Sequence, residues 1–232
     1  MNGSVDELLD AGSPLLVLAP HPDDESLACG LLLAERWLRG IPTHVACVTD
    51  GSASHPGSSS FSPSRLAALR HEELLLAVRC LGGDPVRDVT WMGHPDAASH
   101  RVHAPGSDLA RDVCRLVDRL GAKLLLTASS EDPHCDHVAC ADAAHRVATA
   151  RPSLRMWSYA VWSRWHDWSK GREAAGLPLD LPRRREAKRA AIRAHRSQMG
   201  FVVSDDPEGF RMPPGFADRF CAAPEIFLQV AP

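Results

Sequence analysis

The sequence lacks several features that would place it in a common class of protein. No apolar run approaches the roughly 18 residues that indicate a membrane-spanning helix. The first residues, MNGSVDELLDAGSP, contain neither the basic nor the apolar segment of a secretory signal. The seven cysteines form no Cys-x-x-Cys pair, which indicates reduced thiols rather than a disulfide framework. We therefore expect an unprocessed cytoplasmic protein with no membrane span.

The chain also lacks a strong charge of either sign. Its formal net charge is −3, which gives no electrostatic footprint for nucleic acid, so we expect no nucleic-acid partner. No Gly-x-Gly-x-x-Gly or Gly-x-x-x-x-Gly-Lys-Ser/Thr loop is present. What the chain does have is 232 residues, of which 44% are apolar, and these can bury a substantial core. We expect one domain over residues 1–232.

Short apolar runs alternate with amphipathic stretches along the chain. This alternation predicts an α/β fold, a Rossmann-like three-layer sandwich with a mostly parallel sheet and helices on both faces. Strands are expected at residues 15–19, 43–49, 88–92, 123–128, 155–161 and 225–230. Helices are expected at residues 26–39, 64–81 and 107–120, each capped by the serine at its first position.

Three polar loops that contain histidine follow predicted strands, at residues 50–63, 93–106 and 129–136. Because each loop follows a strand, all three should emerge at the carboxyl edge of the sheet, where open α/β sheets place their ligands. Residues 162–182 fit neither a strand nor a helix of this pattern. We interpret them as a lid or a loop insertion.

The stretch LLVLAPHPDDESLACG, residues 15–30, carries an apolar strand directly into an imidazole and three carboxylates. His21 and Asp24 are three residues apart in a turn that leads into a helix, so their side chains can converge on one point. Asp23 and Asp24 are adjacent carboxylates, which repel each other unless a cation joins them. Nitrogen and oxygen ligands of this kind suit a divalent metal such as zinc.

A second cluster, EDPHCDH, follows the fourth predicted strand and places His134, Asp136 and His137 within four residues. One histidine from it would complete a ligand set of two histidines and one carboxylate, with positions left open for water and substrate. Alternatively, these residues cap helices or bind loop backbone. The position of both clusters at corresponding strand ends of one predicted sheet favours the metal site.

Both clusters match motifs of a known family. The segments APHPDDESLACG and HCDH resemble the two signatures of the PIG-L/LmbE-like family of zinc-dependent amino-sugar N-deacetylases. Further matching segments are VTDG at 48–51, RHEE at 70–73, WMGHPD at 91–96 and KRAAIRAHRSQM at 188–199. Leu31 and Cys135 stand where many members carry glycine and proline, and residues 162–182 match no motif. The resemblance covers nearly the whole chain, and neither departure touches a metal ligand.

The resemblance implies a zinc-dependent hydrolase acting on a small molecule. It would remove the acetyl group from an N-acetylglucosamine-type conjugate and release acetate and a free amine. His21, Asp24 and His137 would hold one Zn²⁺ per chain, and such ligands also accept Fe²⁺ or Co²⁺. Zinc would supply the nucleophile at neutral pH by lowering the pKa of a water molecule.

The resemblance also implies roles for residues that bind no metal. Asp23 would act as the general base and then as the acid that protonates the leaving amine. His134 would stabilise the oxyanion, with Asp136 fixing its ring and tautomer. Arg70 is expected to reach the sugar and Asp96 to bind its hydroxyls, unless the arginine only snorkels and the aspartate only caps a turn.

Other interpretations stay open at the level of sequence. A related zinc amidase that cleaves a larger amide would use the same metal site. A nucleotide-binding α/β module with an acidic magnesium site is disfavoured, because no glycine-rich phosphate loop is present. His195 either lines the cleft or packs beneath it. Tryptophans 157, 162, 165 and 168 form a wall for a sugar or a hydrophobic aglycone, or, for Trp157 and Trp162, belong to the core.

Overall fold

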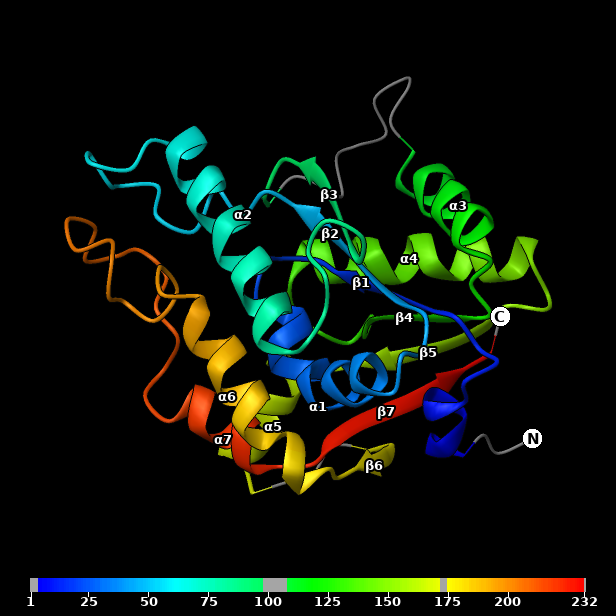
Figure 1. Cartoon of the computed structure of the whole chain (residues 1–232). Helices are drawn as coiled ribbons and strands as arrows, with labels where there is room; N and C mark the ends of the chain where they lie inside the picture. Colours follow the sequence, from blue (N-terminus) through cyan, green and yellow to red (C-terminus); the bar gives the residue numbers. More distant parts are fainter. Residues whose placement is uncertain (1–3, 98–107, 172–174, 232) are drawn as a thin grey trace.

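The computed structural model describes residues 4–97, 108–171 and 175–231, and its centre is a seven-stranded sheet in the order β3-β2-β1-β4-β5-β7-β6 (Figure 1). The strands are β1 (Leu15–Ala19), β2 (Thr43–Thr49), β3 (Val89–His94), β4 (Leu124–Ala128), β5 (Arg155–Tyr159), β6 (Leu177–Leu179) and β7 (Glu225–Val230). Strands β1 to β5 pair in parallel, and β7 pairs antiparallel with β5 and β6. The predicted mostly parallel sheet is confirmed.

Helices cover both faces of this sheet (Figure 1). They are α1 (Asp24–Leu38), α2 (Pro63–Cys80), α3 (Leu109–Leu120), α4 (Cys135–Ala150), α5 (Trp162–Ser169), α6 (Arg185–Ala194) and α7 (Phe216–Ala222), with 3-10 helices η1 (Val5–Leu9) and η3 (Pro182–Arg184). One core lies under α1, α6 and α7, and the other lies under α3 and α4. The predicted three-layer sandwich is therefore confirmed. None of the helices in the described part combines the length and the apolar composition that a membrane crossing requires.

Strand β1 is apolar throughout because both of its faces are buried. Leu15, Val17 and Ala19 belong to the core under α1, whereas Leu16 and Leu18 belong to the core under α3 and α4. Successive side chains of a strand point to opposite faces, so a central parallel strand needs apolar residues at every position. This packing fixes the position at which the chain leaves β1.

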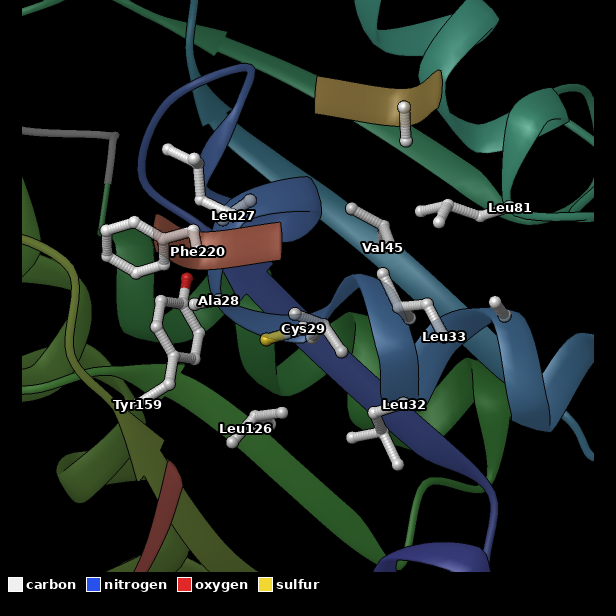
Figure 2. Close-up of a cluster of buried hydrophobic side chains, with 14 of the residues drawn as sticks. Leu27, Ala28, Cys29, Leu32, Leu33, Val45, Leu81, Leu126, Tyr159 and Phe220 are labelled. Carbon is white, nitrogen blue, oxygen red and sulfur yellow. The ribbon is translucent and has the colours of Figure 1, made fainter. Parts of the chain in front are cut away.

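Helix α1 fills the first core. Figure 2 shows its Leu27, Leu32 and Leu33 side chains in one cluster with Val45 of β2 and Leu126 of β4. Every residue from the start of α1 to Arg36 is buried. The amino end of α1, which follows β1 directly, is therefore held rigidly against the sheet.

Residues 162–182 are predicted to be a lid or a loop insertion, and the structure corrects the loop alternative. Trp162–Ser169 is helix α5, and Leu177–Leu179 is an edge strand that pairs with β7. Trp162 and Trp165 pack against the core under α1, and Trp157 is fully buried within it. The side chain of Trp168 and residues 172–174 lie outside the described part of the chain.

All three predicted helix caps are displaced along the chain, and Asp23, rather than Ser26, is the N-cap residue of α1. Ser62, rather than Ser64, caps α2, and its hydroxyl accepts a hydrogen bond from a backbone N–H of the first turn. Asp108 caps α3 in the same way, while Ser107, the predicted cap, lies outside the described residues. Neighbouring polar residues compete for the same cap position, so a serine in the sequence does not identify the cap by itself.

Candidate active site

The two sequence clusters meet at the carboxyl ends of β1 and β4, which are neighbours in the sheet. Residues 20–25 follow β1, and residues 129–137 follow β4. The strand order reverses its direction between these two strands, and such a switch point is where open α/β sheets bind ligands. The prediction that the two clusters lie at corresponding strand ends of one sheet is confirmed, whereas residues 98–106 of the predicted loop 93–106 lie outside the described part of the chain.

Asp24 lies between two predicted metal-ligating histidines at distances that fit a shared ion. The Asp24 Oδ2 atom is 3.3 Å from His21 Nδ1 and 3.3 Å from His137 Nε2. Two ligands at about 2.0–2.1 Å from a tetrahedral zinc lie about 3.3–3.4 Å apart. The His137 Nε2 atom is buried without a hydrogen-bond partner, so its lone pair is available to a metal. His21, Asp24 and His137 therefore fit a divalent metal ion.

A buried aspartate that the sequence interpretation missed orients His137. The Asp132 Oδ2 atom is 2.9 Å from His137 Nδ1. The same carboxylate accepts backbone hydrogen bonds from Val161 and Ser163, which follow β5. A carboxylate at Nδ1 fixes the ring and directs Nε2 toward the metal. The signal was present, because Asp132 is part of the EDPHCDH segment.

His21 is surrounded by carboxylates. Its Nε2 atom is 3.0 Å from Asp136 Oδ2 and 3.3 Å from Asp96 Oδ1. Donor atoms of His21, His134 and His137 also lie within 4.8 Å of one another, as do those of His21, Asp96 and Asp136. Asp96, predicted to bind sugar hydroxyls, thus lies directly beside a predicted metal ligand.

His134 is the N-cap residue of α4, and its Nδ1 atom accepts a hydrogen bond from the backbone N–H of Asp136 at 3.3 Å. The Asp136 carboxylate is 3.8 Å from this nitrogen but 3.0 Å from His21, so it hydrogen-bonds His21 rather than the predicted His134. Burial lowers the pKa of His134, which favours the neutral ring. With Nδ1 accepting, the proton of that ring is on Nε2.

Asp23 is held in a strained backbone conformation beside the metal ligands. Its φ angle is 152°, which a residue with a side chain rarely adopts. Its backbone N–H donates to Glu25 Oε2 at 3.0 Å, and its carboxylate accepts from Arg70 Nη2 at 3.2 Å. Burial raises the pKa of Asp23 to about 6, against the opposing effect of Arg70. Such a carboxyl can both accept and release a proton near neutral pH.

The Glu25 carboxylate, which accepts the Asp23 backbone N–H, is itself held by two other residues. Its Oε1 atom accepts a hydrogen bond from Ser26 Oγ at 2.6 Å and lies 3.0 Å from His195 Nε2. His195 is fully buried, so it packs beneath the cleft rather than lining it. The sequence interpretation gave Glu25 no role, although it is the third carboxylate of the PDDE segment.

Arg70 extends from α2 into the site, where its guanidinium group hydrogen-bonds backbone carbonyls of two loops. Its Nη1 donates to the Gly51 carbonyl at 3.0 Å, and its Nη2 donates to the Pro22 carbonyl at 2.9 Å. Gly51 has a φ of 65°, and a Cβ atom there would lie 2.4 Å from Nη1. Only glycine satisfies both the turn and this approach.

A cavity of about 440 Å³ opens over these residues, which is within the size range of small-molecule pockets. Its polar side includes His21, Asp23, Asp24, Arg70, Asp96 and His134. Asp136 and His137 are fully buried beside it. The structure therefore brings all of the predicted site residues together around one cavity.

Known proteins resemble this chain in sequence. The model of the family described as "PIG-L: GlcNAc-PI de-N-acetylase" matches residues 16–148. A "Probable N-acetyl-alpha-D-glucosaminyl L-malate deacetylase 2" of Bacillus anthracis is 30% identical over 151 residues, which cover 63% of this chain and 65% of the relative. A "1D-myo-inositol 2-acetamido-2-deoxy-alpha-D-glucopyranoside deacetylase" of Mycolicibacterium vanbaalenii is 26% identical over 245 residues, which cover 85% and 84%. This chain thus spans just under two thirds of the first relative.

Solved structures share the fold. The N,N'-diacetylchitobiose deacetylase from Pyrococcus horikoshii superposes with a TM-score of 0.69 at 20% identity, covering 97% of this chain and 86% of that one. The conserved protein TT1542 from Thermus thermophilus gives a TM-score of 0.67 at 21% identity, covering 95% and 96%. At these identities the likeness establishes the three-layer α/β architecture.

Proposed function

The chain belongs to the PIG-L family, and from this premise we propose that it removes the acetyl group from an N-acetylglucosamine-type conjugate, releasing acetate and a free amine. The family match confirms the resemblance found in the sequence. The curated relatives are named for N-deacetylation of two different conjugates, one of L-malate and one of myo-inositol. The convergence of Asp23 with His21, Asp24 and His137 at one strand end is the observation that carries the proposal.

We propose zinc as the metal, held by His21, Asp24 and His137, one ion per chain. The 3.3 Å separations and the partnerless His137 Nε2 atom support this ligand set. When bound, the ion would supply Lewis-acid polarisation of the amide carbonyl and a water molecule of pKa about 7. Fe²⁺ and Co²⁺ suit the same ligands.

Asp23 is the proposed proton carrier. Its carboxylate lines the cavity next to Asp24 and, with a pKa raised to about 6, takes a proton from the attacking water. The same group then returns the proton to the leaving nitrogen. Arg70 and Glu25 hold it in place through its carboxylate and its backbone N–H, respectively.

His134 is the proposed donor to the amide oxygen. Its Nδ1 atom is occupied by the Asp136 N–H, so its Nε2–H remains for the substrate oxygen as negative charge develops there. Asp136 is thus proposed to orient His134 through its backbone and His21 through its carboxylate. Arg70 and Asp96 remain proposed substrate contacts, because both line the cavity.

We propose that residues 1–232 form one catalytic domain that works in the cytoplasm. One continuous sheet includes strands from β1 to β7, so the described elements share a common framework. All seven cysteines are free thiols, as expected in a reducing compartment.

A screen of metal-loaded protein against N-acetylglucosamine conjugates tests the function. Release of the free amine and of acetate is expected from at least one conjugate. Conjugates that carry a larger acyl group in place of acetyl provide the comparison. Faster release from those would identify the related amidase activity instead, and no release from any of them would contradict the proposal.

Replacing His137 by alanine should abolish metal binding. The purified protein is expected to hold about one zinc per chain with bonds of about 2.0–2.2 Å, and the variant should hold almost none, because one of three ligands is lost. Elemental analysis measures the content. His145→Ala, an exposed histidine of the same helix, is the matched control and should keep the metal. Unchanged zinc in the His137→Ala protein would remove this residue from the site.

A further inference from the structure

The cavity has two chemically different sides. Its polar side carries the proposed catalytic residues. Its lining also includes an apolar group of residues, here called the apolar wall, formed by Trp162 at the start of α5, Phe210 and Met212 in the segment before α7, and Phe216 at the start of α7. The apolar wall lies outside residues 16–148, the part that matches the family model.

The aromatic rings of the apolar wall pack against one another. The ring centroids of Trp162 lie 5.7 Å from Phe210 and 5.3 Å from Phe216, and Phe216 lies 4.9 Å from the buried Phe220 behind it. The backbone of the wall is also fixed, because the Phe210 N–H donates to the Ser54 carbonyl at 2.7 Å. Preorganised aromatic surface of this kind favours apolar and aromatic ligand groups.

The charges around the cavity disfavour an acidic aglycone. Among the described residues that line it, Arg70 is the only lysine or arginine. Its two terminal nitrogens donate to Gly51, Pro22 and Asp23, and its buried Nε atom has no hydrogen-bond partner. Glu208, an exposed carboxylate, lies on the lining near Phe210 in sequence. Among the described lining residues, a carboxylate on the aglycone would therefore meet the Glu208 carboxylate and no lysine or arginine other than Arg70, whose terminal nitrogens are already hydrogen-bonded.

We infer that, given the proposed amino-sugar deacetylation, the natural substrate carries an apolar or aromatic, uncharged aglycone that packs on the wall of Trp162, Phe210, Met212 and Phe216. The sugar and its acetamide occupy the polar side of the cavity. The wall then selects the conjugate, whereas the metal ligands and Asp23 perform the same hydrolysis on any conjugate that fits.

Three matched glycosides of N-acetylglucosamine test this inference, with methyl, benzyl and 4-carboxybenzyl aglycones. The benzyl glycoside is expected to have a kcat/KM about tenfold above that of the methyl glycoside, because one buried ring adds apolar contact. The 4-carboxybenzyl glycoside should fall at least about tenfold below the benzyl one, since its carboxylate is left unpaired. Equal or faster turnover of the 4-carboxybenzyl glycoside would overturn the inference.

Variants of the protein test whether the apolar wall causes the preference for the benzyl glycoside. Phe210→Ala should lower the benzyl-to-methyl ratio of kcat/KM about fivefold to tenfold. Phe201→Ala is the matched control, because Phe201 is 69% exposed and lies outside this cavity. Glu208→Lys should raise the rate on the 4-carboxybenzyl glycoside relative to the benzyl glycoside. An unchanged ratio in Phe210→Ala would contradict the role of the wall.

A binding measurement keeps this test independent of turnover. Calorimetry with the Asp23→Asn protein should show tighter binding of the benzyl glycoside than of the other two. If no glycoside releases an amine but the benzyl preference appears in binding, the proposed reaction fails and the apolar site stands. If all three are deacetylated and bound equally, the apolar site fails and the proposed reaction stands.

Discussion

The Asp23→Asn protein is expected to keep its metal and its fold while turnover falls by roughly 10²–10⁴-fold, the usual scale for loss of a general base. The physical reason is that asparagine has nearly the same shape but cannot accept and return a proton. Its side chain can still contact Arg70, whose guanidinium is 3.2 Å from Asp23 Oδ2, and its backbone N–H can still donate to Glu25. The change therefore removes the proton carrier and one negative charge beside Arg70, while the hydrogen-bond geometry can be kept.

Asp24→Asn is the matched control, because the same substitution is made one residue away. Asp24 Oδ2 is 3.3 Å from both His21 Nδ1 and His137 Nε2, so its loss as a charged ligand should weaken metal binding itself. Elemental analysis and turnover measured together on both variants separate the two roles. If Asp23→Asn loses the metal and Asp24→Asn keeps it, the roles are exchanged and the proposed mechanism fails.

The start of α1 shows what local sequence can and cannot predict about this pair. Ser26 is a good N-cap residue, and the sequence therefore predicts a helix from there. The structure begins α1 at Asp24 with Asp23 as the N-cap, because the Asp23 carbonyl accepts the backbone N–H groups of Ser26 and Leu27, and the Ser26 hydroxyl donates to Glu25 instead. The φ of 152° at Asp23 depends on support from the Glu25 side chain, which no local propensity describes.

Strands were the part of the fold best predicted from the sequence. The predicted ranges 15–19, 43–49 and 225–230 match β1, β2 and β7, because buried strands appear as short apolar runs. The edge strand β6 was missed, since it has three residues and includes Pro178. Its pairing partner is β7, which lies far along the chain, and a pattern of nearby residues does not contain that contact.

The site was predictable where its residues cluster in sequence. His21, Asp24, His134 and His137 belong to two short motifs, and the alternation of strands and helices brings those motifs together. The supporting contact from His195 to Glu25 was not predictable, because it joins residues 170 positions apart and rests on how α6 packs against α1. Such contacts depend on tertiary packing rather than on spacing.

A buried ion pair gives the largest expected effect on stability. Lys188 of α6 and Glu225 of β7 are both fully buried, and Lys188 Nζ is 2.6 Å from Glu225 Oε1. The same carboxylate accepts the backbone N–H groups of Leu31 and Leu32 inside α1 at 2.7 and 2.9 Å. The pair therefore joins α1, α6 and β7 at one point. A Cβ atom at Gly30 would lie 2.8 Å from Lys188 Cγ, so α1 has a glycine where the lysine passes.

Lys188→Met should lower the free energy of unfolding by about 3–5 kcal/mol, because it leaves a buried carboxylate without its cation. Burial already raises the pKa of Glu225, and Lys188 opposes that shift. In the variant, no cation offsets the desolvation of the Glu225 carboxylate. Urea denaturation at fixed metal content measures the loss. Arg189→Met is the matched control on the same helix, since the Arg189–Glu186 pair is exposed and should contribute less than about 1 kcal/mol.

The double variant Lys188→Met/Glu225→Gln tests whether the two buried charges stabilise the fold through their mutual interaction. If the loss in Lys188→Met comes from an unpaired charge, removing the second charge should restore part of the stability, because a neutral glutamine no longer needs a buried cation. The glutamine can still accept a hydrogen bond from Leu31 or Leu32. If the double variant is instead as unstable as the sum of the two single variants, the residues act independently and the ion pair does not couple α1 to α6.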